Sequence, residues 1–482
     1  MWIENTDAIT GAGVFRCNTP VSMRREEKNI LDKNRGFSSR IGFILSTAAF
    51  SIGIGNLWKF PYVVGNNGGG AFLLIYLIMV LLVGIPAFLI ELTLGRSSQL
   101  SPFMGMRKLE NKKKTGWGII GFFGCFSIFI IVSYATMIVG GWTVGYFIKV
   151  LSGAFQGMAA EEIGAVFGSF AGDPITLVFG AGEALLLWFC LTSGVKKGVE
   201  KVCSVMLPTL FVIMIGLAIY SNTLPGALEG LKWYLIPDFS KVTSSSIAAA
   251  ATQVFFSIGI GMCGGFVYGS YISKDNNLTQ SVVVTGVLDT CVAVLAGLLV
   301  VPALFSYGIE PTAGPSLIFV TLPQLFNEMG SLGNIFGALF MLCVFFAGFT
   351  SILGGSEGLV ACICDAGKMS RKKASTLIVV AQYLVSILFT MSFGTGTLSK
   401  ISIMGLGLFD FADFLSSLGL CLGVVAMLAY VLCRWGFKKF KEEANAGATG
   451  KIRVYDWMKP YLCYVFPVLM IVVVYWVISA YI

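Results

Sequence analysis

Histidine is absent from this 482-residue chain, and only 12% of its residues are charged. The lack of imidazole removes the commonest general base and a frequent zinc ligand. Cys362 and Cys364 form the one close cysteine pair, and with no second pair they do not make a zinc site. An ordinary soluble protein has roughly 25% charged residues, so the scarcity of charge argues against that class and points to lipid as the main solvent.

Apolar residues take the place of the missing charge. They make up 56% of the chain, in long stretches separated by short charged loops, and a membrane-spanning helix needs about 20 mostly apolar residues. We predict one all-α membrane protein with eleven spans, near 41–66, 71–94, 116–150, 176–194, 203–221, 246–272, 281–305, 334–365, 374–394, 408–433 and 460–482. Two polar segments between spans, 151–175 and 306–333, are long enough to have structure of their own.

The net charge of +8 is distributed over loops on one side of the predicted spans. Basic residues cluster in Met1–Arg40, Arg96–Lys114, Lys196–Lys201, Lys368–Lys373 and Arg434–Lys459. Loops 153–173 and 307–328, on the other side, contain no lysine or arginine. Since basic loops face the cytosol, we predict an inner (plasma) membrane protein in the lipid bilayer, with a cytosolic N-terminus and an external C-terminus. This pattern is unlike the basic face of a nucleic-acid-binding protein, and we expect no nucleic-acid partner.

The termini and the cysteines carry less information. The first 40 residues are polar and have no apolar core before a cleavage site, so we do not expect a signal peptide. Most of the 12 cysteines, among them Cys125 and Cys263, lie inside apolar stretches, where a small buried thiol is the usual state. The predicted outer loops contain no cysteine, so no external disulfide is expected.

Two predicted spans are interrupted by glycine. The first contains the sequence SIGIG at Ser51–Gly55, followed by Asn56, and the sixth contains the same sequence at Ser257–Gly261. Each glycine costs about 1 kcal/mol of helix propensity, and non-helical backbone at membrane depth survives only where it lines a cavity or is buried in protein. Close packing of small residues would explain one such span. Two of them, five spans apart, favour a transporter built from inverted repeats, with freed N–H groups for an anion and freed carbonyls for a cation.

Several motifs in order along the chain closely resemble the neurotransmitter:sodium symporter family. They are Arg40–Leu45, Gly53–Pro61 (GIGNLWKFP), Asn67–Phe72 (NGGGAF), Gly84–Pro86, Glu91 with Gly95–Arg96, Gly141–Trp142, Lys197–Glu200, Leu207–Pro208, Pro237–Phe239, Gln253–Ser257, Phe346–Ser351 and Asp410–Asp413. The resemblance implies a LeuT-like fold, with two inverted five-helix repeats, unwound spans 1 and 6, and one extra span. The implied organisation is a cytosolic segment 1–39, a transporter core 40–435, and a cytosolic loop with span 11 in 436–482.

The same resemblance implies two sodium sites. The first would use the Ser51 carbonyl and the side chains of Asn56, Ser257 and Asp289. Asp289 is also notable by itself, because a carboxylate in the middle of an apolar span is costly and suggests a functional site. The second site would use the carbonyls of Ala49, Ile52 and Ala347 with the hydroxyls of Thr350 and Ser351.

Asp289 also bears on chloride. Chloride-dependent members of the family have an uncharged Asn at this position and a Ser four residues later, where this chain has Ala293. Tyr76, Gln253 and Ser257 match the rest of that anion pocket. A fixed negative charge would repel chloride and could replace it electrostatically, so we expect chloride-independent transport.

The implied substrate site follows from the first break. The N–H groups of Ile54 and Gly55 would hold a carboxylate, and Gly53 stands where amine carriers of the family have Asp. The walls would be Val132, Phe256, Gly259, Met262, Ser351 and Gly355. The small glycines and the apolar Phe256 and Met262 favour a bulky hydrophobic or aromatic amino acid.

One departure concerns the tyrosine that the family places six residues before the tryptophan of span 3, where its hydroxyl contacts the substrate carboxylate. Here that position is Thr136, and Tyr134 lies two residues further from Trp142. Either an offset in the helix brings Tyr134 to the site, or Thr136 is a weak substitute. In the second case an amine, an indole or an osmolyte becomes a possible substrate.

The resemblance also implies an outer and an inner gate, each formed by a pair of oppositely charged side chains. Lys59 would face Asp413 at the outer side, without the planar fork of the usual arginine. At the inner side Asp365 matches the family, and Arg35 is the nearest candidate for its partner. We therefore expect a sodium-coupled symporter that imports a small amino-acid-like substrate. A non-transporting sensor with this fold stays possible, and an enzyme is not expected because no catalytic base or paired acid motif is present.

Overall fold

The computed structural model describes residues 36–110, 115–309, 316–367, 369–393 and 397–479, and these are almost entirely helical. The elements are α2 (Arg40–Ser51), η1 (Gly55–Lys59), α3 (Phe60–Asn66), α4 (Gly70–Met79), η2 (Val80–Gly84), α5 (Ile85–Ser98), α6 (Pro102–Leu109), α7 (Ile119–Thr136), η3 (Met137–Thr143), α8 (Val144–Leu151), α9 (Ala160–Phe170), α10 (Pro174–Thr192), η4 (Val195–Glu200), α11 (Lys201–Ser221), α12 (Ala227–Leu235), η5 (Phe239–Lys241), α13 (Ser244–Ile258), α14 (Gly264–Tyr271), α15 (Leu278–Ser306), η6 (Leu317–Thr321), α16 (Leu322–Glu328), α17 (Ser331–Asp365), α18 (Arg371–Ser392), η7 (Thr397–Lys400), β1 (Ser402–Ile403), β2 (Leu406–Gly407), α19 (Leu408–Tyr430), η8 (Val431–Trp435), α20 (Phe437–Ala444), η9 (Asp456–Met458), η10 (Tyr461–Val465) and α21 (Phe466–Ser479).

Nine helices in the described residues are long and apolar enough to cross a membrane. A tenth span is the bent pair Arg40–Ser51 and Gly55–Asn66, whose halves meet at 56°. Helices α13 and α14, separated by the glycines of the second SIGIG sequence, supply the sixth span in chain order. Together these account for the eleven predicted spans. Span 5 begins at Val195 instead of 203, because the lysines of η4 continue the helix beyond its apolar part.

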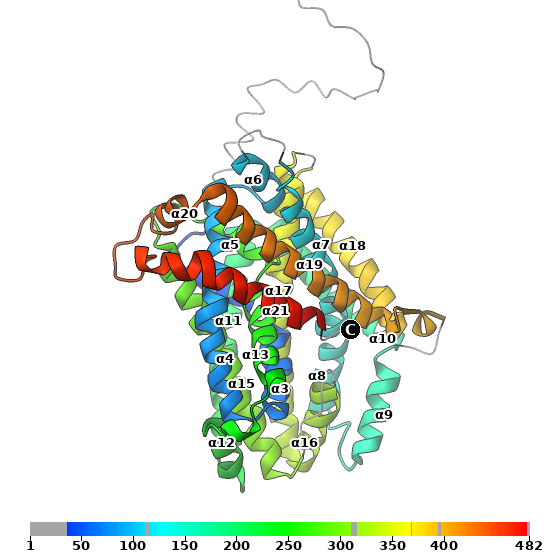
Figure 1. Cartoon of the computed structure of the whole chain (residues 1–482). Helices are drawn as coiled ribbons and strands as arrows, with labels where there is room; N and C mark the ends of the chain where they lie inside the picture. Colours follow the sequence, from blue (N-terminus) through cyan, green and yellow to red (C-terminus); the bar gives the residue numbers. More distant parts are fainter. Residues whose placement is uncertain (1–35, 111–114, 310–315, 368, 394–396, 480–482) are drawn as a thin grey trace, which may run out of the picture.

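The helices form an elongated bundle (Figure 1). Helices α6 and α20 lie at one end, hereafter the α20 end, and helices α12 and α16 lie at the other, the α12 end. The predicted structure in segments 151–175 and 306–333 is present at the α12 end as α9 and α16. A short antiparallel strand pair, β1–β2, lies within Ser402–Gly407, just before α19.

The break in span 1 begins where α2 ends at Ser51. Ile52 is extended, with φ −69° and ψ 101°, and the helix resumes as the π-helical turn η1. The Asn56 side-chain oxygen accepts the Gly53 N–H at 3.2 Å. A side chain from the second half-helix therefore satisfies a donor that the break has freed.

The break in span 6 has a different support. Gly259, Gly261 and Cys263 have φ values of +72°, +84° and +57°, a region that glycine enters at no steric cost. The carboxylate of Glu91, buried on α5, accepts the N–H of Gly261 at 3.0 Å and of Phe266 at 3.3 Å. One buried carboxylate thus bonds to the backbone of the break and of the second half-helix of span 6.

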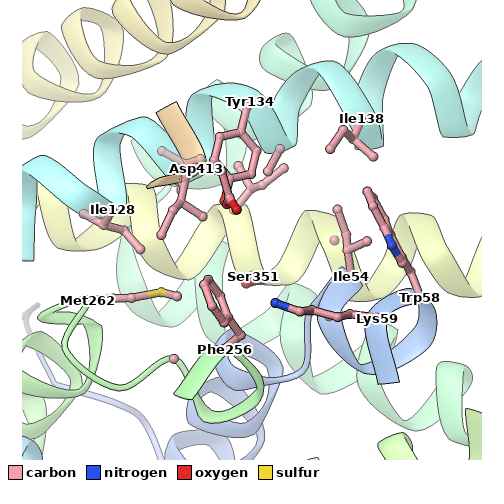
Figure 2. A pocket seen from close by; sticks show the side chains of 18 of the residues that line it. Ile54, Trp58, Lys59, Ile128, Tyr134, Ile138, Phe256, Met262, Ser351 and Asp413 are labelled. Atoms are coloured by element: carbon pink, nitrogen blue, oxygen red, sulfur yellow. The ribbon is translucent and has the colours of Figure 1, made fainter. Parts of the chain in front are cut away.

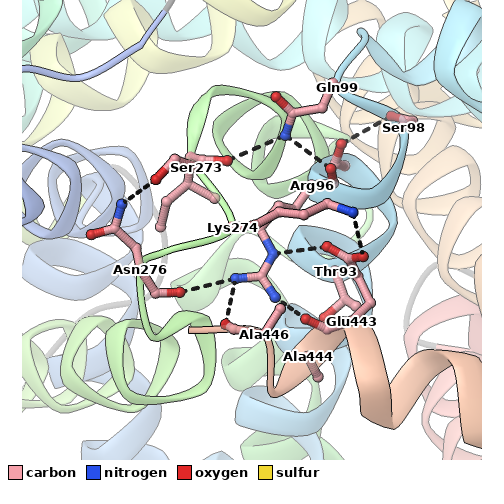
Figure 3. A network of polar contacts seen from close by, with 12 residues as sticks. Thr93, Arg96, Ser98, Gln99, Ser273, Lys274, Asn276, Glu443, Ala444 and Ala446 are labelled. Carbon is pink, nitrogen blue, oxygen red and sulfur yellow. Dashed lines mark hydrogen bonds and ion pairs between the residues drawn. The ribbon is translucent and has the colours of Figure 1, made fainter. Parts of the chain in front are cut away.

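A polar network fixes α20 to the bundle (Figure 3). The fully buried guanidinium of Arg96, at the end of α5, donates from Nε to Glu443 Oε1 at 3.0 Å and from Nη1 to the Asn276 carbonyl at 3.0 Å. Lys274 Nζ lies 3.4 Å from Glu443 Oε2, and Thr279 donates to the Ala444 carbonyl at 3.0 Å. This α20 latch ties the loop between spans 10 and 11 to spans 2 and 7.

Candidate functional site

The two helix breaks meet at a cavity of about 390 Å³ in the middle of the bundle. Figure 2 shows side chains from both breaks pointing toward those of α7 and α17. The cavity is lined by Phe50, Ser51, Gly53, Ile54, Gly55, Trp58, Lys59, Tyr62, Ile128, Ile131, Val132, Tyr134, Ala135, Ile138, Phe256, Gly259, Met262, Gly348, Ser351, Ile352, Phe409, Asp410 and Asp413. The lining reaches the exposed Asp410 near the start of α19, so the cavity extends toward the α12 end.

Three of the four residues expected at the first sodium site are joined by hydrogen bonds. Asn56 Nδ2 donates to Asp289 Oδ1 at 2.9 Å and to Ser257 Oγ at 3.0 Å, and Ser257 Oγ donates to Asp289 Oδ2 at 2.6 Å. All three side chains are completely buried. The fourth residue, Ser51, donates its hydroxyl to the Ile258 carbonyl at 3.1 Å, which brings the ends of α2 and α13 together.

The chemistry of this cluster fits an alkali cation. The hydrogen-bond partners of Asp289 in the described structure, Asn56 and Ser257, are neutral. A buried carboxylate is stabilised by a cation, and carboxylate, amide and hydroxyl oxygens are hard ligands. One carboxylate together with neutral amide and hydroxyl oxygens is a donor set that favours a singly charged hard ion.

The residues expected at the second sodium site lie where α17 crosses the end of α2. Ser351 Oγ donates to the Phe50 carbonyl at 3.0 Å, between the buried Ala49 and Ile52. Thr350 donates to two carbonyls of its own helix, Phe346 at 2.9 Å and the expected ligand Ala347 at 3.2 Å. Because α2 ends here, its last carbonyls have no further helical turn to accept from.

Two of the matched anion-pocket residues contact Ser257 or the neighbouring break in span 1. The Tyr76 hydroxyl lies 3.2 Å from Ser257 Oγ, and Gln253 Nε2 donates to the Gly55 carbonyl at 3.1 Å. Ala293, one helical turn after Asp289 on α15, is fully buried. Among these described residues, only Tyr76 and Asp289 have ionisable side chains, and Asp289 is the one that supplies a carboxylate.

Seven of the nine expected substrate residues line the cavity, namely Ile54, Gly55, Val132, Phe256, Gly259, Met262 and Ser351. Thr136 does not reach it: its side chain is buried and donates to the Val132 carbonyl at 3.0 Å. Gly355 does not reach it either, because the space beside its Cα is filled by Val132 and Ile128. A Cβ at Gly259 would lie 3.2 Å from the Phe50 ring, so this glycine gives little extra volume.

Of the two candidates on span 3, Tyr134 and not Thr136 lines the cavity. The Tyr134 hydroxyl donates to Asp413 Oδ1 at 3.0 Å (Figure 2). The reason is the π-helical segment η3, which separates Tyr134 from Trp142. Since i to i+5 bonding widens the turn, counting back from Trp142 with α-helical spacing selects the wrong face.

The expected outer-gate residues both line the cavity. Lys59 Nζ lies 4.1 Å from the centre of the Phe256 ring, a cation–π contact, while Asp413 accepts from Tyr134. At the α20 end, Asp365 Oδ2 accepts the Ser101 N–H at 2.6 Å. Arg35, its expected partner, lies outside the described residues.

Sequence reasoning missed Glu357 and gave no role to Glu91, which it quoted only as part of a motif. Glu357, buried on α17, accepts Arg371 Nη1 at 3.0 Å and the Tyr271 hydroxyl at 2.9 Å, which joins spans 6, 8 and 9 at the α20 end. Glu91 supports the span 6 break. The rule that singled out Asp289, an acid inside an apolar span, would have found both glutamates.

Comparisons with known proteins agree with the fold. The family model described as "Sodium:neurotransmitter symporter family" matches residues 34–159 and 177–482. The uncharacterized sodium-dependent transporter YhdH of Bacillus subtilis is 34% identical over 87% of this chain and 93% of its own length. The uncharacterized sodium-dependent transporter MJ1319 of Methanocaldococcus jannaschii is 32% identical over 92% and 90%.

A solved structure gives the same result in three dimensions. The crystal structure of MhsT in complex with L-phenylalanine superimposes with a TM-score of 0.81 at 34% identity, covering 92% of this chain and 99% of that one. This match confirms the predicted LeuT-like fold of two inverted five-helix repeats plus one extra span. The chain therefore belongs to the sodium:neurotransmitter symporter family, and it is a sodium-dependent, multi-pass membrane transporter and not an enzyme.

Proposed function

We propose that this transporter is a symporter that couples the inward sodium gradient to the import of a hydrophobic or aromatic amino acid by alternating access, without chloride. The observation that carries the proposal is the buried cluster of Asn56, Ser257 and Asp289, which lies directly behind the cavity at both helix breaks. Asn56 belongs to η1, the half-helix that begins at Ile54 and Gly55, two residues that line the cavity. One segment would therefore bind both sodium and a substrate carboxylate.

The coupling follows from this shared segment. A cation at Asp289 would be bound by the side chain of Asn56, and a substrate carboxylate would be bound at the positive end of the same half-helix. Each ligand would favour the conformation that the other needs, because both order the same break. The second site, at Ser351 and the end of α2, would fix the other half of span 1 against α17.

The walls of the cavity support an apolar side chain. Ile128, Val132, Phe256, Met262 and Ile352 line it, and a volume of about 390 Å³ suits a side chain as large as an aromatic ring. MhsT, which this chain resembles, was solved with L-phenylalanine. Together these favour phenylalanine-like substrates over glycine.

A carrier of an amine is the second candidate. Asp410 and Asp413 line the outer part of the cavity and could attract a cationic substrate. Gly53, with Ser351 Oγ 3.3 Å from where its Cβ would stand, offers no acid deeper in the site. The amine candidate therefore has attraction at the entrance but no deep partner.

We further propose that the α20 end is cytosolic, with a cytosolic N-terminal segment before residue 40 and an external C-terminus. The basic α20, with Lys438, Lys439 and Lys441, lies at that end, as the positive-inside rule requires. The cavity then extends toward the external side, from which an importer loads its substrate.

Uptake into proteoliposomes tests the proposal. Labelled phenylalanine, tryptophan, leucine, glycine and a monoamine are offered with an inward gradient of sodium or of potassium, and with gluconate in place of chloride. We expect accumulation of the large amino acids only with sodium, unchanged by gluconate. Accumulation of the amine alone would favour the second candidate. Sodium binding without accumulation of any compound would indicate a sensor, and strict loss in gluconate would contradict chloride independence.

A further inference from the structure

The thiols of Cys125 and Cys362 face each other on the α20 side of the cavity. Their Sγ atoms are 3.2 Å apart although the two residues are 237 positions apart in sequence. Cys125 lies on α7, three residues before the cavity-lining Ile128, and Cys362 lies on α17, three residues before its last residue, Asp365. Both residues are partly exposed.

A third cysteine packs against α7, the helix that carries Cys125. Cys263, in the break of span 6, has its Sγ 3.9 Å from the Ile120 carbonyl on α7. A Cβ added at Gly124 would lie 2.0 Å from that sulfur. The break of span 6 therefore packs against α7 at Gly124, the residue before Cys125, with no spare room between them.

We propose that Cys125 and Cys362 form an oxidisable dithiol, which a two-electron oxidant converts into a disulfide that ties span 3 to span 8 and arrests transport. The reaction forms one S–S bond and breaks two S–H bonds. With a diazenedicarboxamide as oxidant, the two protons and two electrons reduce its N=N bond to a hydrazine. A small dithiol reverses the change by exchange.

The geometry explains why the bond would affect transport, an argument that rests on the proposed alternating access. A disulfide is about 2.05 Å long, so the sulfurs must approach by about 1 Å. This movement pulls α7 toward α17 at the residue next to Gly124, where Cys263 has no clearance. Since the proposed orientation places this end in the cytosol, the dithiol is the resting form and the disulfide forms under oxidative stress.

The first test needs no substrate. The full-length protein in proteoliposomes is treated with diazenedicarboxylic acid bis(dimethylamide), its remaining thiols are alkylated under denaturing conditions, and its peptides are analysed without reduction. We expect a cross-linked Cys125–Cys362 peptide, absent from C125S and C362S and still present in C433S, which removes an exposed cysteine on η8. Failure to detect that peptide, or detection of other cysteine pairs only, would overturn the proposal.

The second test measures transport of whichever amino acid the uptake assay identifies. We expect oxidant to lower wild-type uptake in proportion to the cross-linked fraction, dithiothreitol to restore it, and C125S and C362S to be insensitive. A cross-link that leaves uptake unchanged would overturn the arrest. Because the peptide measurement does not depend on uptake, failure of the proposed substrate and failure of the dithiol are distinguishable.

Discussion

At the scale of single residues, Asp289 is the residue of the site with the most proposed roles. It is fully buried and bonded to neutral partners in the described structure. Its charge has two proposed roles, as a sodium ligand and as a fixed substitute for chloride. These roles can be separated by changing the charge while keeping the shape, because asparagine is nearly isosteric with aspartate.

We expect D289N to lower sodium-driven uptake by about tenfold or more, equivalent to about 1.4 kcal/mol. The double variant D289N/A293S adds a hydroxyl one turn later on α15 and should recover uptake only when chloride is present. Initial rates in chloride and in gluconate measure both effects. Wild-type rates in D289N would show that the carboxylate has neither role.

Tyr134 and Thr136 form a natural pair for comparison. The Tyr134 hydroxyl crosses the cavity to Asp413, whereas the Thr136 hydroxyl bonds within its own helix. Tyr134 lines the cavity, where a substrate carboxylate would accept from its hydroxyl. A hydrogen bond to a charged group contributes about 1.5–3 kcal/mol, so Y134F should raise the KM for substrate by roughly tenfold or more. T136V should change it less than about threefold. The opposite order of effects would mean that Thr136, and not Tyr134, contacts the substrate.

At the scale of elements, the breaks depend on positions where only glycine is unstrained. Gly261 has φ +84°, and a Cβ there would lie 2.5 Å from the Leu420 carbonyl oxygen on α19. Gly216, in the middle of α11, is exposed and has open space around it. The same substitution at the two sites therefore has opposite consequences.

G261A should destabilise the protein by more than about 1–3 kcal/mol, the usual cost of this backbone region for other residues, and abolish uptake. G216A should leave uptake unchanged and stabilise the helix by roughly 0.5–1 kcal/mol. Thermal unfolding in detergent and uptake in proteoliposomes provide the two measurements. Full uptake by G261A would show that the break tolerates a side chain.

The α20 latch is the second element with a measurable contribution. Arg96 is completely buried, and Glu443 supplies its carboxylate partner. Removing one partner of a buried ion pair costs roughly 3–5 kcal/mol, so E443A should lower the melting temperature by several degrees. K274A removes a pair whose lysine is 64% exposed and should cost less than about 1 kcal/mol. Equal effects from the two variants would contradict a buried latch.

Sequence patterns predicted some elements better than others. Long apolar stretches identified the nine uninterrupted spans and the bent first span of the described residues, and the repeated SIGIG sequence identified both breaks. Helices α6, α12 and α20 were not predicted, because they are short and lie at polar ends of the bundle. The pairs Arg96–Glu443 and Cys125–Cys362 join segments far apart in the chain, so only the tertiary structure brings them together.

At the scale of the whole molecule, the family resemblance predicted the site residues, which the apolar periodicity could not predict. It assigned most of the site by position, and seven of nine substrate residues line one cavity. The two exceptions have local causes that no linear pattern contains. A π-helical segment rotates Thr136 away, and the side chains of Ile128 and Val132 fill the space beside Gly355.

Sodium should also stabilise the whole fold. Its proposed ligands come from α2, η1, α13, α15 and α17, so a bound ion would join segments from both repeats. A ligand at 100 times its Kd adds about 2.7 kcal/mol. We expect a higher melting temperature in sodium than in potassium at equal ionic strength, with much of the difference lost in D289N. Identical melting in the two salts would argue against these sites.

The α20 latch also has a consequence for biosynthesis. The partner of Arg96, Glu443, is 347 residues further along the chain and is synthesised much later. Until the ribosome has made Glu443, the guanidinium at the end of span 2 lacks the carboxylate that pairs with it in the folded protein. A chain that ends before residue 443 therefore cannot form this buried ion pair, although all the residues of span 2 are present.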